Sequence, residues 1–205
     1  MNSLAIIPTK AQAEELLTWA HEHNPGPWAD HSRAAARAAQ VIAAACGLDT
    51  ERAYVSGLLH DIGRYEGVRG LHHVIAGYEL MRRKGYPAIA EICLSHSFAL
   101  QDIRAYGGGA NDCTPEELAV LETYLSTAVY NEYDRLIQLC DSMCSAQGVC
   151  LIDVRLLDVT RRYGFHPLTL ADWEAVFALK HHFDALCGKN IYGLFEDEIR
   201  RVSIC

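Results

Sequence analysis

Histidine and aspartate residues that could hold a divalent metal ion are spread along much of this chain. Imidazole and carboxylate groups together suit ions such as Fe, Mn, Co, Ni and Zn. Asp141 lies within an apolar helical stretch, RLIQLCDSM, where an unpaired carboxylate would be costly. The other candidates fall near the ends of predicted helices, and the ends of packed helices can converge on one point. The candidate ligands are His31, His60, Asp61, His73, His96 and Asp141.

The elements that must position these side chains are predicted to be helices. Thr9 begins a capping-box pattern, and Pro87 and Pro115 stand where first-turn prolines belong. Residues 149–154 are the only strand-like stretch, and they lack a partner strand. Residues 97–113 contain three consecutive glycines and are predicted to be a loop. After a first helix that follows Thr9, we expect helices at about 29–46, 49–61, 72–85, 87–96, from 115, 134–147, 153–163, 170–186 and 190–202.

Length, composition and charge limit the classes of protein to consider. The chain has 205 residues, of which 50% are hydrophobic and 21% charged, as in an ordinary globular protein. We expect an all-α fold with a single domain over residues 1–205. A formal net charge of -8 argues against a nucleic-acid partner, since duplex binding depends on Lys and Arg. No apolar stretch approaches the ~18–20 residues of a membrane span, so we expect no membrane partner.

Eight cysteines are a second conspicuous feature of the composition, but they include no Cys-x-x-Cys pair. We interpret them as small buried hydrophobic residues of a protein kept in a reducing compartment. The N-terminal residues MNSLAIIPTK do not read as a signal peptide. The expected location is therefore cytoplasmic.

The order of the candidate ligands is typical of a known family. His31, then His60 and Asp61 within GLLHDIGR, then Asp141 resembles the signature of the HD superfamily of metal-dependent phosphohydrolases. The resemblance covers about residues 28–147. It implies a helical HD-domain enzyme that hydrolyses a nucleotide or another small phosphate ester or anhydride.

The resemblance extends to the binuclear members of this family. His73 stands in HVIAG and His96 in EICLSHS, which is similar to the arrangement that holds a second metal ion in those members. Asp61 would bridge two divalent ions (Fe, Mn, Co, Ni or Zn). A water molecule between two cations becomes a hydroxide near neutral pH and can attack phosphorus. The first ion would be held by His31, His60, Asp61 and Asp141.

Two arginines could bind the phosphate of the substrate. Arg64 directly follows the Gly63 turn, and Arg69 lies in the next loop before His73. Both could contact a phosphate in a bidentate manner, or both could be solvated loop residues. Asp61 and Arg64 are the predicted catalytic residues, and Arg64 and Arg69 the predicted substrate-binding residues.

Several alternatives stay open at this level. The same ligand set occurs in HD-type di-iron oxygenases, and a non-catalytic nucleotide-binding regulator could retain it. The C-terminal helical extension, residues 148–205, lies outside the resemblance. Its charged residues could flank the pocket or merely cover the core, and residues 106–111 could form a lid. The charged residues in question are Asp153, Arg155, Arg161 and Arg162.

Overall fold

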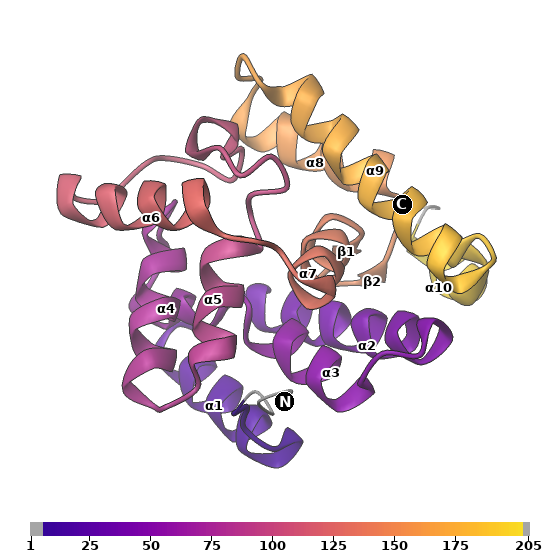
Figure 1. Ribbon diagram of the computed structural model, residues 1–205, viewed down its shortest axis with the longest axis horizontal. Coiled ribbons are helices and arrows are strands. Elements are labelled where there is room, and N and C mark those ends of the chain that lie inside the picture. The colour runs from indigo at the N-terminus through magenta and orange to yellow at the C-terminus, as the bar shows by residue number, and fades with distance from the viewer. Residues whose placement is uncertain (1–5, 203–205) are drawn as a thin grey trace.

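The computed structural model describes residues 6–202, and helices dominate them (Figure 1), as the sequence predicted. Three short 3-10 helices and one two-stranded hairpin complete the described structure. The 3-10 helices are η1 (Ile62–Glu66), η2 (Ile103–Ala105) and η3 (Ile191–Leu194), and the strands are β1 (Cys144–Ser145) and β2 (Gly148–Val149). The α-helices are α1 (Lys10–His23), α2 (Trp28–Cys46), α3 (Thr50–Leu59), α4 (His72–Arg83), α5 (Pro87–Ser95), α6 (Pro115–Thr127), α7 (Glu132–Ser142), α8 (Ile152–Tyr163), α9 (Thr169–Cys187) and α10 (Glu196–Val202).

Side-chain caps fix the starts of several helices. The Thr9 hydroxyl accepts a hydrogen bond from the Gln12 backbone N–H, and the Thr9 N–H donates to the Gln12 side chain. Thr114 and Glu117 form a second capping box at the start of α6. Asp49 caps α3 by accepting two backbone N–H bonds. These contacts satisfy backbone donors that the first turn of a helix leaves unpaired.

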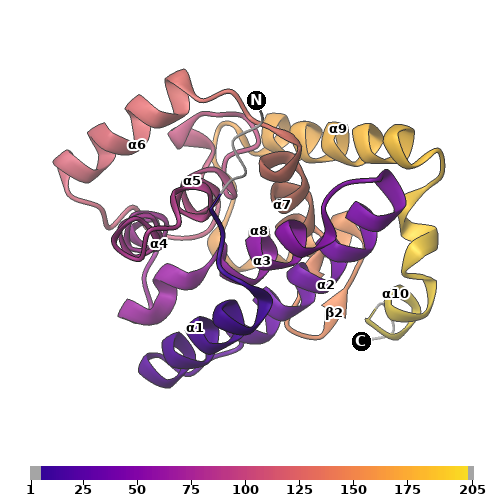
Figure 2. The same cartoon turned by 60° about the horizontal axis from the view of Figure 1, so that its bottom comes forward.

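Helix α7 occupies the centre of the molecule. It packs against α2, α3 and α5 on one side and against α8 and α9 on the other (Figures 1 and 2). Its side chains Leu136, Ile137, Leu139 and Cys140 are fully buried. The central position of α7 explains how Asp141 comes to lie inside the fold.

Three predicted elements differ from the structure. The strand-like stretch at 149–154 was expected to lack a partner, but Val149 lies in a paired strand and α8 begins at Ile152. The helix predicted at 134–147 ends at Ser142, because a hairpin in which Cys144 pairs with Val149 follows it. Gly148 allows this hairpin, since its φ of 129° is a conformation that favours glycine. The helix predicted at 190–202 is divided into η3 and α10.

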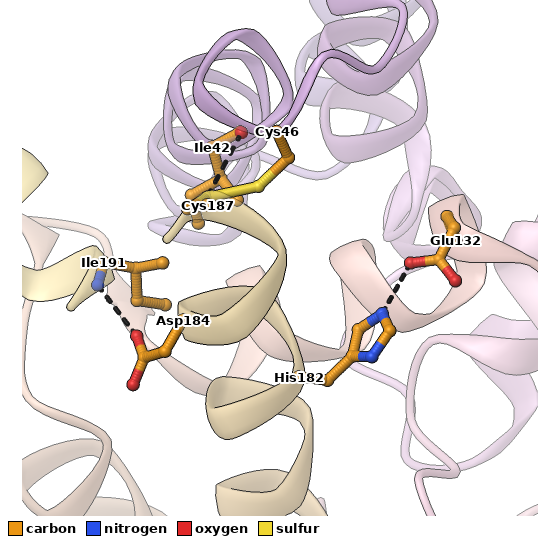
Figure 3. Close-up of a disulfide and its surroundings, with 7 residues drawn as sticks. All are labelled: Ile42, Cys46, Glu132, His182, Asp184, Cys187 and Ile191. Atoms are coloured by element: carbon orange, nitrogen blue, oxygen red, sulfur yellow. Dashed lines mark hydrogen bonds and ion pairs between the residues drawn. A yellow bond between two sulfur atoms is a disulfide. The ribbon is translucent and has the colours of Figure 1, made fainter. Parts of the chain in front are cut away.

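A shared apolar core, one disulfide and several polar contacts hold the C-terminal helices to the rest of the chain. Cys46, at the end of α2, forms a disulfide with Cys187, at the end of α9 (Figure 3). His182 of α9 contacts Glu132 of α7 at 2.7 Å in the same view. Asp184 accepts a hydrogen bond from the backbone N–H of Ile191 at 2.8 Å and thereby fixes the turn after α9.

The disulfide corrects the interpretation of all eight cysteines as unbonded core residues. Cys46 and Cys187 are separated by 141 positions, but their Cα atoms lie 4.6 Å apart because the two helix ends meet. Such a meeting cannot be read from sequence spacing. Five other cysteines are free thiols, and Cys205 lies outside the described residues. No helix within residues 6–202 is long and apolar enough to cross a membrane.

Candidate metal centre

The structure brings all six candidate ligands together, because the ends of several helices converge on one point. His60 and Asp61 directly follow α3, His73 lies in the first turn of α4, and His96 directly follows α5. His31 comes from α2, and Asp141 comes from the last turn of α7. The four histidines and Asp61 are buried, whereas Asp141 is half-buried.

Two groups of ligand atoms share one carboxylate. Asp61 belongs to a group with His31 and His60, and it also belongs to a group with His73 and His96. Its Oδ1 lies 3.1 Å from His73 Nε2 and 3.6 Å from His96 Nε2. Asp61 thus lies between the two groups of histidines.

Asp141 belongs to a third group, which it forms with His60 and His96. Its Oδ1 lies 2.9 Å from His31 Nε2 and 3.7 Å from His60 Nε2. The His31 contact joins residues that are 110 positions apart in the sequence. The position of Asp141 in the cluster therefore depends on a long-range contact between α2 and α7.

Backbone carbonyls orient three of the four imidazoles. The Nδ1 atom of His60 lies 2.7 Å from the Gly57 oxygen, that of His73 lies 2.5 Å from the Gly70 oxygen, and that of His96 lies 2.9 Å from the Cys93 oxygen. Each contact fixes the ring and leaves Nε2 facing the cluster. Metal-bound histidines typically use their second ring nitrogen in this way.

The glycine of the His-Asp-Ile-Gly run has a steric role in the site. A Cβ on Gly63 would lie 2.0 Å from the His73 backbone oxygen and 2.4 Å from the Gly77 nitrogen. Only glycine permits η1 to approach α4 this closely. This approach places Asp61 and His73 within reach of each other, which explains why the motif needs a glycine at this position.

Both carboxylates and His73 carry the charges that metal ligands require. Burial lowers the pKa of His60, but Asp141 and Asp61 outweigh burial and raise it. Burial disfavours the charge of Asp61, but Arg64 and His73 outweigh burial and hold the pKa of this carboxyl well below its usual range. Burial also opposes the ionisation of Asp141, whose pKa is nevertheless held low by His31. Burial and the charge of Arg64 lower the pKa of His73 to about 4. At neutral pH the carboxylates are therefore anionic and His73 is neutral, which are the metal-binding forms.

Buried atoms without partners indicate that a cation fits this cluster. His60 Nε2 and Asp61 Oδ1 are buried and have no hydrogen-bond partner among residues 6–202. His73 Nε2 and His96 Nε2 lie only 3.3 Å apart. Buried polar atoms are normally satisfied, and a divalent ion would satisfy those of the cluster. The mixed set of nitrogen and oxygen donors does not select one metal.

Comparison with known proteins gives one match. Residues 28–145 match the family described as HD domain. This span covers more than half of the chain and includes all six cluster residues. The chain belongs to the HD domain family. Searches of curated proteins and of solved structures returned no match.

The HD domain is typical of metal-dependent phosphohydrolases, and the buried His and Asp groups are the ones that such an enzyme uses. In this HD domain the adjacent residues His72 and His73 have different surroundings. His73 faces Asp61, whereas His72 lies between Glu66 at 2.9 Å and Glu117 at 3.2 Å. The structure thus places His73, the histidine of the HVIAG motif, at the cluster and places His72 outside it.

A polar cavity of about 160 Å³ opens next to the cluster of the HD domain. Arg64 lines this cavity, and its Nε donates a hydrogen bond of 2.5 Å to Asp61. Arg69 is exposed and is not among the described residues that line the cavity, so the geometry does not support its predicted contact with substrate. Tyr106 and Gly107, from the segment interpreted as a lid, form part of the cavity wall.

The helices beyond the matched HD domain supply another wall of the same cavity. Arg155 and Arg162 of α8 line this cavity. The sequence left open whether these arginines flank the pocket or cover the core, and the structure places them at the pocket. Sequence reasoning missed Asp172 of α9, whose pKa is raised to about 6 by burial and by the charge of Asp141. The spacing of Arg155, Val159 and Arg162 in the sequence predicts that they lie on one face of a helix. Nothing in the sequence indicated where that face would point.

Proposed function

We propose that this HD domain hydrolyses a small phosphate ester or anhydride, such as a nucleotide, with two divalent metal ions. The observation that carries the proposal is the convergence of two buried ligand groups that share Asp61. When bound, the ions would activate water and neutralise charge on the phosphoryl group. The proposed ligands are His31, His60, Asp61 and Asp141 for one ion and Asp61, His73 and His96 for the other.

Asp61 and Arg64 are the proposed catalytic pair. The Arg64 side chain holds the Asp61 carboxylate in one orientation through its Nε atom. The guanidinium carries further donors in a planar fork, which suit the oxygens of a phosphoryl group. Burial opposes the charge of Arg64, but Asp61 more than compensates and raises the pKa of the guanidinium. The cation therefore stays charged at any pH at which the protein works.

Tyr106 is a second group that could contact the substrate. Its hydroxyl is buried in the cavity wall and has no hydrogen-bond partner in the described part of the chain. Burial raises the pKa of this phenol, so it remains protonated and can donate a hydrogen bond. A phosphate ester or anhydride offers acceptor oxygens for such a donor.

The proposed location is the cytoplasm, with a small phosphorylated molecule as the partner. In that compartment glutathione and thioredoxin reduce most disulfides. The state of Cys46 and Cys187 in the cell is therefore a direct check on the location.

Metal analysis of protein purified without oxygen, followed by phosphate release from a panel of phosphorylated compounds, tests this function. We expect about two ions per chain and turnover with Mn under argon. A strict requirement for dioxygen and iron would instead identify an oxygenase. Nucleotide binding without turnover in any divalent metal would identify a regulator.

A further inference from the structure

The cavity next to the metal centre has a cationic wall that lies outside the matched HD domain. Arg155 and Arg162 come from α8, whereas every proposed metal ligand comes from residues 28–145. The proposed function requires one phosphate-binding cation beside the metal ions, and Arg64 supplies it. The arginines of α8 therefore need a separate explanation.

Arg155 is the least paired of the three arginines that line the cavity. Its Nε is buried and has no hydrogen-bond partner within residues 6–202. Its Nη1 lies 3.5 Å from Asp158, which also accepts a shorter bond of 2.9 Å from Arg162. Asp158 is more than half exposed, so its charge is well screened by solvent. A buried guanidinium donor without a partner points to an anion that is supplied from outside the chain.

Arg155 lines the same cavity as His31 and Asp141 of the metal centre. Arg64 stands beside Asp61 in η1, and Arg155 stands in α8, so the two cations belong to different walls of one cavity. A ligand with two separate anionic groups could contact Arg64 with one group and Arg155 with the other.

We propose that Arg155, assisted by Arg162, binds a second anionic group of the substrate, distinct from the phosphoryl group at the metal centre. This inference rests on the proposed phosphohydrolase function and narrows it. The substrate class becomes phosphate anhydrides and phosphorylated acids that carry at least two anionic groups. Monoesters of neutral alcohols would lack the group that Arg155 binds.

Two non-reacting probes test the subsite on the full-length, Mn-loaded protein. Inorganic phosphate reports on the metal centre alone, whereas methylenediphosphonate carries a second anionic group. We expect Arg155→Gln to weaken diphosphonate binding by about 10- to 100-fold, as for the loss of a charge-assisted hydrogen bond. Phosphate affinity and metal content should stay within about twofold of wild type. Titration calorimetry and metal analysis measure these quantities.

Arg161→Gln is the matched control, because Arg161 is exposed on the same helix and is not among the described residues that line the cavity. It should leave both affinities unchanged. Unchanged diphosphonate binding in Arg155→Gln would overturn the proposed subsite. Equal losses of phosphate and diphosphonate binding would also overturn it, because they would show that the substitution acts through the metal centre. The proposed function fails separately: a protein with intact probe binding that releases no phosphate from any substrate would refute hydrolysis and leave the anion subsite in place.

Discussion

The matched HD domain and the helices that follow it contribute differently to the same cavity. Residues 28–145 supply every proposed metal ligand, and all of these side chains except Asp141 are buried. Helices α8 and α9 supply Arg155, Arg162 and Asp172, which are half-buried or exposed. Under the proposed function, the HD domain would supply the chemistry and the C-terminal helices would select the substrate.

This division of roles has a physical basis. Metal ligands must be deprotonated and correctly oriented before an ion binds, so they belong in a rigid core. Groups that recognise the remainder of a substrate can stand on a separate wall and can change without disturbing the ions. The attachment of this wall through α7 and through the disulfide keeps it at the mouth of the centre.

Asp61→Ala, in the HD domain, should lower activity more than any other variant considered. Removal of the carboxylate shared by both ligand groups should lower kcat/KM by more than about 1,000-fold and should reduce metal content. Activity assays combined with metal analysis measure both effects. Asp30→Ala, which removes a largely exposed carboxylate next to His31, is the control. Retention of both ions in Asp61→Ala would show that the shared carboxylate is not a ligand.

His96→Ala should separate the two ion positions. His96 belongs to the group with Asp61 and His73, and it also lies near His60 and Asp141 in a further group. We assign it to the second ion. We expect loss of one ion before the other and a decrease in kcat of about 10- to 100-fold. Metal content measured over a series of chelator concentrations checks this order. Equal loss of both ions would contradict a binuclear centre.

Cys46→Ser should weaken the connection between the two regions. A disulfide restricts the unfolded chain, and its removal typically lowers the free energy of unfolding by about 2–4 kcal/mol. Urea denaturation of oxidised protein measures the loss. Wild-type protein in dithiothreitol should match the variant, and Cys113→Ser, which removes a free thiol, should not reproduce the effect. If reduction leaves the wild-type protein unchanged, the bond is not formed in solution.

Asp172→Asn should have the smallest effect, and the size of its effect on the free energy of unfolding depends on pH. The pKa of Asp172 rises on folding from 3.8 to about 6, so the folded metal-free protein binds an extra proton between these values. Through this group, stability is lost as the pH rises from about 4 to about 6. The variant should therefore be more stable than wild type by about 1–2 kcal/mol at pH 7, after allowance for partial exposure, and equal to it below pH 4.

Chelator-treated protein and urea denaturation at several pH values check this prediction. A stability difference between Asp172→Asn and wild type that does not change with pH would show that Asp172 is not perturbed in the folded protein.

The sequence could predict the HD domain better than it could predict the C-terminal wall. Helix starts at Thr9, Pro87 and Thr114 follow from local capping, and the motifs around His60 and His73 mark the centre. The inward face of α8 depends on long-range packing against α7, for which the sequence has no local signal. The disulfide between Cys46 and Cys187 likewise depends on long-range packing, so the sequence could not predict it.

The pairing of His31 with Asp141 also sets the order in which the centre can be completed during synthesis. The ligands that follow α3, α4 and α5 leave the ribosome while α7 is still being made. A nascent chain that ends before Asp141 contains the group of Asp61, His73 and His96, but it lacks the contact between Asp141 and His31. The wall formed by α8 and α9 is synthesised later still. Under the proposed function, all the metal ligands are therefore synthesised before the wall that would contact the substrate.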